Sequence, residues 1–170
     1  MPTNRTTSSS TNAARSAKDT RPDAIKLLTE DHSEVKKLFK QYNKLAEGEA
    51  DASEREPLAL EICDMLSVHA QIEEEIFYPA CREVLGDEGD LVDEAAVEHQ
   101  SAKDLIAQIR DGSADDDLYD AKVKVLGEYL DHHVKEEQDE LFPKVHRKID
   151  AKDVGEQLLM RKEELMAAAH

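Results

Sequence analysis

Apolar residues recur along most of the chain at intervals of three and four positions, which is the period of an amphipathic helix with one buried face. Gly48 follows the first periodic segment and Asp111-Gly112 the third, and glycine commonly ends a helix. The pattern therefore predicts four long helices and a shorter fifth one. They cover residues 22–47, 57–79, 90–110, 116–143 and 152–166.

The apolar stripes of the four long segments resemble heptads, the pattern of helices that pack at shallow angles. The connections between them are short, so consecutive helices are expected to be antiparallel neighbours. The fold class predicted is all-α, an up-down-up-down four-helix bundle over residues 22–149, followed by a short C-terminal helix over residues 150–170.

Residues 1–21 are rich in Ser, Thr and Asn and show no apolar periodicity. We interpret them as a disordered, solvated tail rather than a transit peptide, because they lack an apolar face.

The composition excludes several classes of partner. The chain has 39 acidic and 22 basic residues, a formal net charge of −17, which argues against nucleic acid or an anionic membrane surface. No apolar run is long enough to span a bilayer, and Cys63 and Cys81 are too few for a disulfide framework and are expected to be free thiols. A cytoplasmic location is the resulting expectation.

An internal repeat divides the chain. The motif His69-x3-Glu73-x5-Pro79 returns as His133-x3-Glu137-x5-Pro143, and in each half an earlier segment carries one further histidine on its stripe. A tandem pair of helical hairpins is the simplest explanation. The second segment is expected to begin at Pro57, a favourable first-turn residue, and the prolines of the motif are expected to end their helices.

Six polar residues interrupt the apolar stripes. One histidine on a stripe is commonly an ordinary core residue, but burying six polar groups without partners would cost several kcal/mol or more. Counted from the helix ends, the four histidines fall at the same depth, roughly 15 Å from one end at 1.5 Å per residue. The sequence thus predicts a single polar layer in the core, consisting of His32, His69, Glu73, His99, His133 and Glu137.

Nitrogen and oxygen ligands without a thiolate suit a first-row transition metal better than a cysteine-type zinc site or an all-oxygen calcium site. Six such ligands exceed what one ion normally takes from a protein, so two ions that share carboxylates are expected, with iron as the natural choice. Ferritin-like di-iron proteins carry Glu-x-x-His motifs. That alternative fails here, because the residues three positions before the stripe histidines are Thr29, Leu66, Ala96 and Leu130.

These six residues and the stretch HHVKEEQDELFP (132–143) resemble the hemerythrin-like HHE cation-binding domain family. The resemblance covers residues 22–149 and implies a four-helix bundle with a non-haem di-iron centre, hence two iron ions as cofactor. Matched by position, it assigns His32 and His69 to one iron and His99 and His133 to the other, with Glu73 and Glu137 as bridges.

The chain departs from the oxygen-carrying hemerythrins at Lys103, where those proteins have a second histidine on the third helix. The more symmetric set is similar to the HHE subgroup associated with iron or oxygen sensing and peroxide chemistry. We therefore expect a protein that handles O2, peroxide, NO or iron, with a small diatomic molecule or peroxide as its ligand. A catalase- or peroxidase-type enzyme, a sensor or interaction module, and a purely structural bundle are the alternatives.

Three residues near the layer receive structural interpretations. His132 points about 100° away from its neighbour on a helix and is expected at the core boundary. Tyr129 and Tyr42 are expected to be core tyrosines, although either could reach the site.

Overall fold

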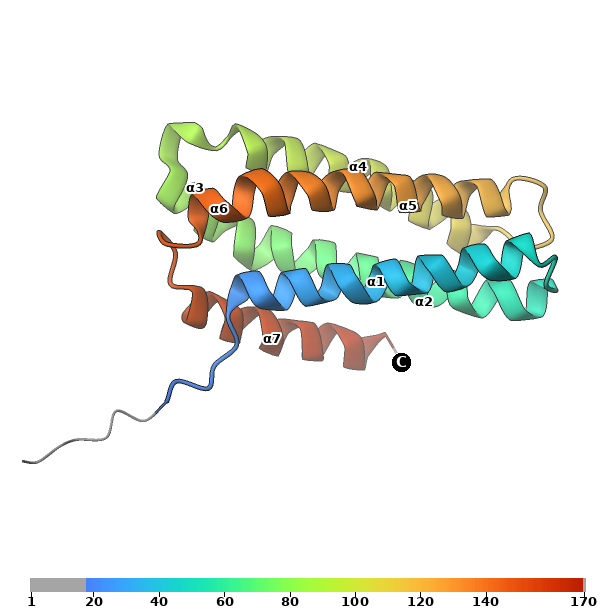
Figure 1. Cartoon of the computed structure of the whole chain (residues 1–170), viewed down its shortest axis with the longest axis horizontal. Helices are drawn as coiled ribbons and strands as arrows, with labels where there is room; N and C mark the ends of the chain where they lie inside the picture. Colours follow the sequence, from blue (N-terminus) through green and yellow to red (C-terminus); the bar gives the residue numbers. More distant parts are fainter. Residues whose placement is uncertain (1–17, 170) are drawn as a thin grey trace, which may run out of the picture.

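The structure of the chain, a computed structural model, describes residues 18–169. All regular secondary structure in this range is helical, which confirms the all-α class. Figure 1 shows the long helical rods side by side and a shorter rod, α7, along one flank. Of the tail predicted over residues 1–21, residues 1–17 lie outside the described part.

The second and fourth rods each join α-helical and π-helical segments without a break. The first is α1 (Ala24–Glu47); the second joins α2 (Ala52–Ile72), the π-helical segment η1 (Glu73–Phe77) and α3 (Tyr78–Leu85). After the 3₁₀ turn η2 (Gly86–Glu88), α4 (Asp90–Asp111) forms the third rod. The fourth joins α5 (Tyr119–Glu136), the π-helical segment η3 (Glu137–Leu141) and α6 (Phe142–Val145), and α7 (Ala151–Ala168) completes the chain.

Contacts between the rods form a closed ring, in which α1 packs on α2, α2 on α4, α4 on α5 and α5 on α1. The buried apolar side chains fall into two clusters. One contains Leu28 of α1 and the other contains Val35 of the same helix, with the buried His32 between them. The polar layer predicted from the sequence thus separates the two halves of the hydrophobic core.

The prediction that Pro57 begins the second helix was wrong. The helix begins at Ala52, because Asp51 adopts an extended conformation and its carbonyl accepts hydrogen bonds from the amides of Glu54 and Arg55. Pro57 lies inside the helix. There it removes one amide donor, and its exposed ring meets little packing.

The helices also continue past Pro79 and Pro143, where they were expected to end. Each proline is preceded by a π-helical segment, in which the amide of Tyr78 bonds to the carbonyl of Glu73, and the amide of Phe142 to that of Glu137. The wider π turn places each proline at the start of a new α-helix, where a missing amide donor is tolerated. Both segments begin at a glutamate of the polar layer.

The fifth helix docks on the beginning of the first. Gly155 of α7 is buried, and a Cβ atom at this position would lie 2.0 Å from the carbonyl oxygen of Pro22 and 2.8 Å from the amide nitrogen of Ala24. Val154 and Leu158 on the same helix join the core cluster around Leu28. Glycine therefore sets how closely α7 approaches the rest of the molecule.

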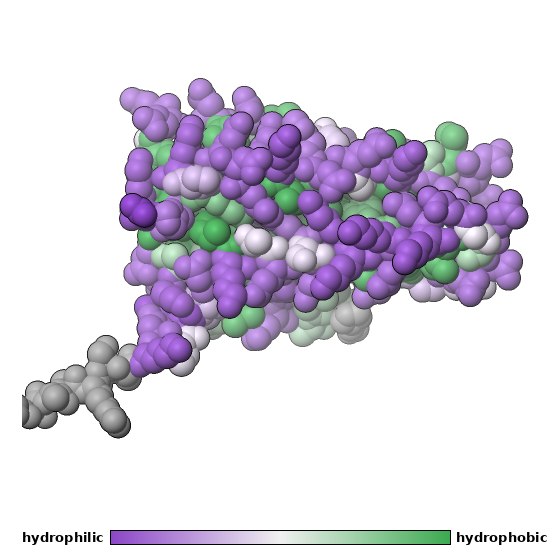
Figure 2. All heavy atoms as spheres, viewed as in Figure 1, coloured by the Kyte–Doolittle hydropathy of each residue, from purple (hydrophilic) through white to green (hydrophobic). Residues whose placement is uncertain are grey.

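Hydrophilic side chains cover most of the face seen in Figure 2, as the high charge of the chain leads one to expect. No helix in residues 18–169 combines the length and apolar character needed to cross a membrane. Cys63 and Cys81 are both buried and free.

Candidate metal centre

The structure brings all six predicted polar residues together in the core. Each helix of the ring provides one histidine, and each π-helical segment begins with one of the two glutamates. All six side chains are buried, and Glu73 is fully inaccessible to solvent. Six ionisable groups from four helices therefore face one another with little exposure to solvent.

Their possible ligand atoms form two groups that share a carboxylate. His32, His69, Glu73 and Glu137 can each offer one atom, and these atoms lie within 4.8 Å of one another; Glu73 forms a similar group with His99 and His133. Glu73 lies between the two pairs of imidazoles. Glu137, from the second half of the repeat, lies close to His32 and His69 of the first half.

The imidazole pairs have the spacing of ligands on a common ion. The Nε2 atoms of His32 and His69 are 3.2 Å apart, and those of His99 and His133 are also 3.2 Å apart. Two nitrogen atoms bound at about 2.1 Å from one metal ion, at a right angle, lie roughly 3 Å apart. The observed separations match that arrangement at both pairs.

The carboxylates supply the strongest sign that the layer is built for cations. Glu73 Oε1 lies 2.7 Å from His69 Nε2, and Glu137 Oε1 lies 2.5 Å from His133 Nε2. Nevertheless all four carboxylate oxygens are buried and have no partner with hydrogen-bond geometry among the described residues. Carboxylates buried in this way are costly unless a cation compensates them, so the residues present fit a pair of metal ions.

Polar side chains outside the layer fix the histidine rings. His69 Nδ1 is 3.1 Å from Asp31, and His133 Nδ1 is 3.0 Å from Glu98. The Nδ1 of His32 is 3.0 Å from the amide oxygen of Gln138. A hydrogen bond from Nδ1–H orients an imidazole and leaves its Nε2 lone pair for a metal.

Sequence reasoning missed Asp31, Glu98 and Gln138, although a signal for them exists. Each supporting residue is adjacent in sequence to a residue of the layer: Asp31 and Glu98 precede the histidines of α1 and α4, and Gln138 follows the glutamate of η3. The fourth histidine, His99, has a similar neighbour. Glu74 follows the glutamate of η1, and its Oε1 lies 3.4 Å from His99 Nδ1. The internal repeat therefore extends to the supporting residues.

Two aromatic residues make the centre asymmetric. Tyr78 and Phe142 occupy equivalent positions, directly after the π-helical segments. The Tyr78 hydroxyl lies 3.2 Å from His99 Nε2 and 3.4 Å from His133 Nε2, whereas the Phe142 ring stacks on His32 at 6.0 Å between centroids. One imidazole pair therefore has a hydroxyl beside it and the other has only an apolar ring.

Sequence reasoning considered other tyrosines and missed Tyr78. Tyr42 donates its hydroxyl hydrogen to Asp120 at 2.6 Å and does not belong to the layer. Tyr129 lines a small cavity beside the histidines. The available signal for Tyr78 was its place in the repeat, five residues after the glutamate.

Lys103 and His132 both lie at the edge of the centre. Lys103, which replaces the second histidine of the oxygen carriers, is exposed and pairs with Glu74 at 2.7 Å. His132, which was expected at the core boundary, is exposed and lies 3.1 Å from Glu136. Neither side chain belongs to the buried groups of possible ligands.

The buried charges change the pKa values of the histidines. Burial alone would lower the pKa of His69, but the charge of Glu73 and the bond to Asp31 outweigh it and raise this pKa to about 10. Glu137 likewise overcomes burial at His133 and raises its pKa to about 12. Burial is the largest influence on His99 and lowers its pKa. Protons and metal cations therefore compete for His69 and His133.

Comparisons with known proteins agree with this geometry. A family model described as the hemerythrin HHE cation binding domain matches residues 23–145. A solved structure of a hemerythrin HHE cation binding domain-containing protein from Mycobacterium kansasii is similar, with a TM-score of 0.71 and 24% sequence identity over 87% of this chain and 90% of that one. No curated protein matches the sequence significantly.

Proposed function

Because the chain belongs to the hemerythrin HHE cation-binding domain family, we propose that it binds two iron ions in an up-down-up-down four-helix bundle and handles a small ligand there. The ligand is O2, NO or peroxide. The observation that carries the proposal is the set of four buried carboxylate oxygens, without a hydrogen-bond partner in residues 18–169, that lie between two pairs of imidazoles. Nitrogen and carboxylate donors without thiolate suit non-haem iron.

In this proposal the first imidazole pair, His32 and His69, holds one iron and the second pair holds the other. Glu73 and Glu137 would be ligands shared by the two ions. Glu73 belongs to both groups of possible ligands, and Glu137 belongs to the group of His32 and His69 while its Oε1 lies 2.5 Å from His133 Nε2. The iron ions supply the electron transfer that protein side chains cannot perform.

The chain itself orients the ligands, excludes water and holds protons. Asp31, Glu98 and Gln138 fix the imidazole rings through their Nδ1 atoms. Leu66 and Leu130 are buried beside the layer and keep bulk water away from it. Tyr78 holds a hydroxyl proton next to the second imidazole pair, where burial and the charges of the glutamates raise its pKa above the usual range.

Elemental analysis of protein expressed in iron-rich medium, with the visible spectrum recorded alongside, tests the assignment. About two irons per chain with near-ultraviolet absorption of a bridged centre are expected, since six side-chain ligands are more than one ion normally takes from a protein, where open positions are filled by water or substrate. A single zinc ion, or no metal after anaerobic reconstitution with Fe(II), would show that the histidine layer has been misinterpreted.

A peroxide-consuming enzyme is the second candidate function, and Tyr78 is the observation that favours it. Its hydroxyl is the proton donor closest to the second imidazole pair, and proton transfer is needed when an O–O bond is cleaved. Replacing Tyr78 by phenylalanine should leave iron content unchanged and reduce H2O2 turnover by about a hundredfold or more, the usual range for loss of a general acid. Turnover by the wild-type protein no faster than that of free iron would exclude this function.

Metal affinity and the stability of the metal-free protein should respond oppositely to pH. Binding must displace protons from His69 and His133, whose pKa values are raised from 6.5. Apparent affinity for Zn²⁺, a redox-inert probe, should therefore rise with pH by up to about a hundredfold per unit. The raised pKa values stabilise the folded, metal-free protein. This stabilisation is complete below pH 6.5 and is lost as the pH increases towards 10.

Chelator competition and denaturant unfolding across this range measure the two quantities. An affinity independent of pH would mean that neither histidine is protonated in the metal-free protein. Stability that increases between pH 7 and 9 would contradict the assigned direction of the pKa shifts.

A further inference from the structure

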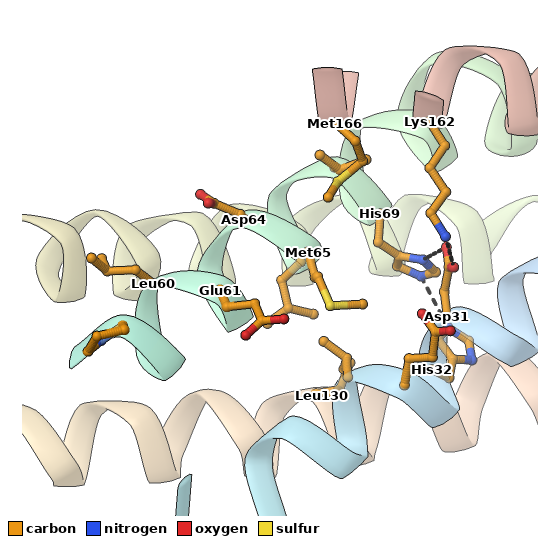
Figure 3. Close-up of a pocket in the computed structure, with 15 residues that line it drawn as sticks. Asp31, His32, Leu60, Glu61, Asp64, Met65, His69, Leu130, Lys162 and Met166 are labelled. Atoms are coloured by element: carbon orange, nitrogen blue, oxygen red, sulfur yellow. Dashed lines mark hydrogen bonds and ion pairs between the residues drawn. The ribbon is translucent and has the colours of Figure 1, made fainter. Parts of the chain in front are cut away.

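A cavity with a volume of about 590 Å³ lies between α1, α2 and α7. In Figure 3 its labelled residues extend from Leu60 at one end, past Met65 and Leu130, to His69 and Asp31 at the other. Leu130 belongs to α5, which packs on α1 within the ring of helices, so the cavity reaches from α7 into the interior of the ring.

The inner end of this cavity reaches the candidate metal centre. His32 and His69, the first imidazole pair, both form part of its wall. A second, smaller cavity of about 40 Å³ lies beside His69, His99 and His133. Leu66, His69 and Leu130 line both cavities and therefore form the partition between them. Together the two spaces lead from beneath α7 to both imidazole pairs.

We propose that the cavity beneath α7 is the access route by which a neutral, weakly polar diatomic gas reaches the dinuclear centre. This inference rests on the proposed function and narrows its ligand to O2 or NO. It assigns Met65, Leu66 and Leu130 to the channel wall and α7 to its cover.

The lining distinguishes this class of ligand from peroxide and from anions. Val35, Met65, Leu66 and Leu130 form an apolar part of the lining whose side chains offer no hydrogen-bond partner, so a strongly hydrated molecule would lose its water there without compensation. The carboxylates that line the cavity, Asp31, Glu34, Glu61 and Asp64, outnumber the ammonium group of Lys162 and would repel anions. An uncharged gas with weak hydration experiences neither barrier.

The cover of the channel is connected to the centre through two contacts. Lys162 of α7 pairs with Asp31 at 2.5 Å, and Asp31 contacts His69 Nδ1 at 3.1 Å. Met166, one turn further along α7, also lines the cavity, and Figure 3 shows both α7 residues above His69. A displacement of α7 would therefore both widen the channel and disturb Asp31, which orients the His69 ring.

A bulky residue in the channel should slow ligand arrival without changing the centre. Met65→Trp fills the cavity at a position outside both buried groups of possible ligands. Leu105→Trp is the matched control, because Leu105 is also partly buried but lines neither cavity. With iron content equal in all three proteins, stopped-flow mixing of the diferrous forms with NO should show an association rate lowered about tenfold or more in Met65→Trp and unchanged in Leu105→Trp.

Equal rates in the wild type and Met65→Trp, with two irons in each, would overturn the route and leave the proposed function intact. If Met65→Trp fails to fold, Met166→Ala replaces it, with an increased rate expected and an unchanged rate counting against the route. A wild-type protein without iron would instead overturn the proposed function, and the route with it.

Xenon provides a readout that does not require iron. This apolar gas occupies dry cavities in pressurised crystals, and density is expected beneath α7 in the metal-free wild type and not in Met65→Trp. Xenon absent from the wild-type cavity would overturn the proposal. An ordered organic molecule or a chain of water molecules filling the cavity would also overturn it, since the space would then be a small-molecule site or a hydrated one.

Discussion

Replacement of Glu137 by alanine should abolish formation of the dinuclear centre. The carboxylate is buried, has no hydrogen-bonding partner within the described residues, and lies in one group with both imidazoles of the first half while its Oε1 is 2.5 Å from His133 of the second. Loss of a residue that merely supports a ligand costs about 10- to 100-fold in metal affinity, so loss of a shared ligand should cost more. Iron content by elemental analysis should fall below one ion per chain.

Glu140→Ala is the matched control for this experiment. Glu140 belongs to the same π-helical segment but is exposed, so its replacement removes an equal charge and leaves the layer intact. Iron content in this variant should equal that of the wild type. Glu137→Ala protein that retained two irons would refute the assignment of Glu137 as a bridge, and equal losses in both variants would point to the helix rather than the ligand.

Replacement of Gly155 by alanine should detach α7 from the rest of the molecule. The added methyl group would lie 2.0 Å from the carbonyl oxygen of Pro22 and 2.8 Å from the backbone nitrogen of Ala24, and neither atom can rotate away as a side chain can. Overpacking typically costs 1–3 kcal/mol, and a clash with backbone belongs at the upper end. We expect a loss of about 3 kcal/mol in denaturant unfolding and faster amide exchange throughout α7.

Gly127→Ala separates this clash from the intrinsic preference of alanine for helices. Gly127 lies inside α5, where an added Cβ would meet the Phe39 ring at 3.1 Å, a side chain that can shift slightly. Alanine gains up to about 1 kcal/mol over glycine in a helix interior, so the net change should be close to zero. A Gly155→Ala protein as stable as Gly127→Ala would show that α7 tolerates a more distant position.

The helical period made the polar layer predictable. On a helix with 3.6 residues per turn, His32 falls between the apolar residues Leu28 and Val35 on one face, and the same holds for the other histidines. The depth of each histidine could be counted from the helix ends, so the meeting of all six residues followed from short connections alone. The all-α class followed from the same periodicity.

The π-helical segments were not predictable from that period. An extra residue in a turn shifts the helix face by about 100°, so Phe77 is fully buried where a regular helix would have presented Ile76. The supporting residues Asp31, Glu98 and Gln138 were not predicted, for a different reason. Each follows or precedes a ligand on a neighbouring face and contacts a histidine from another helix, which sequence spacing cannot show.

The sharing of carboxylates between the two halves has a consequence for how metal enters and leaves. Glu137 from the second hairpin completes the group around His32 and His69 of the first, and Glu73 from the first hairpin does the same for the second. Neither hairpin can assemble a full ligand set alone, so tight binding must follow their association during folding. Bound metal would therefore hold the two hairpins together, and its removal by a chelator should lower the free energy of unfolding of the whole bundle.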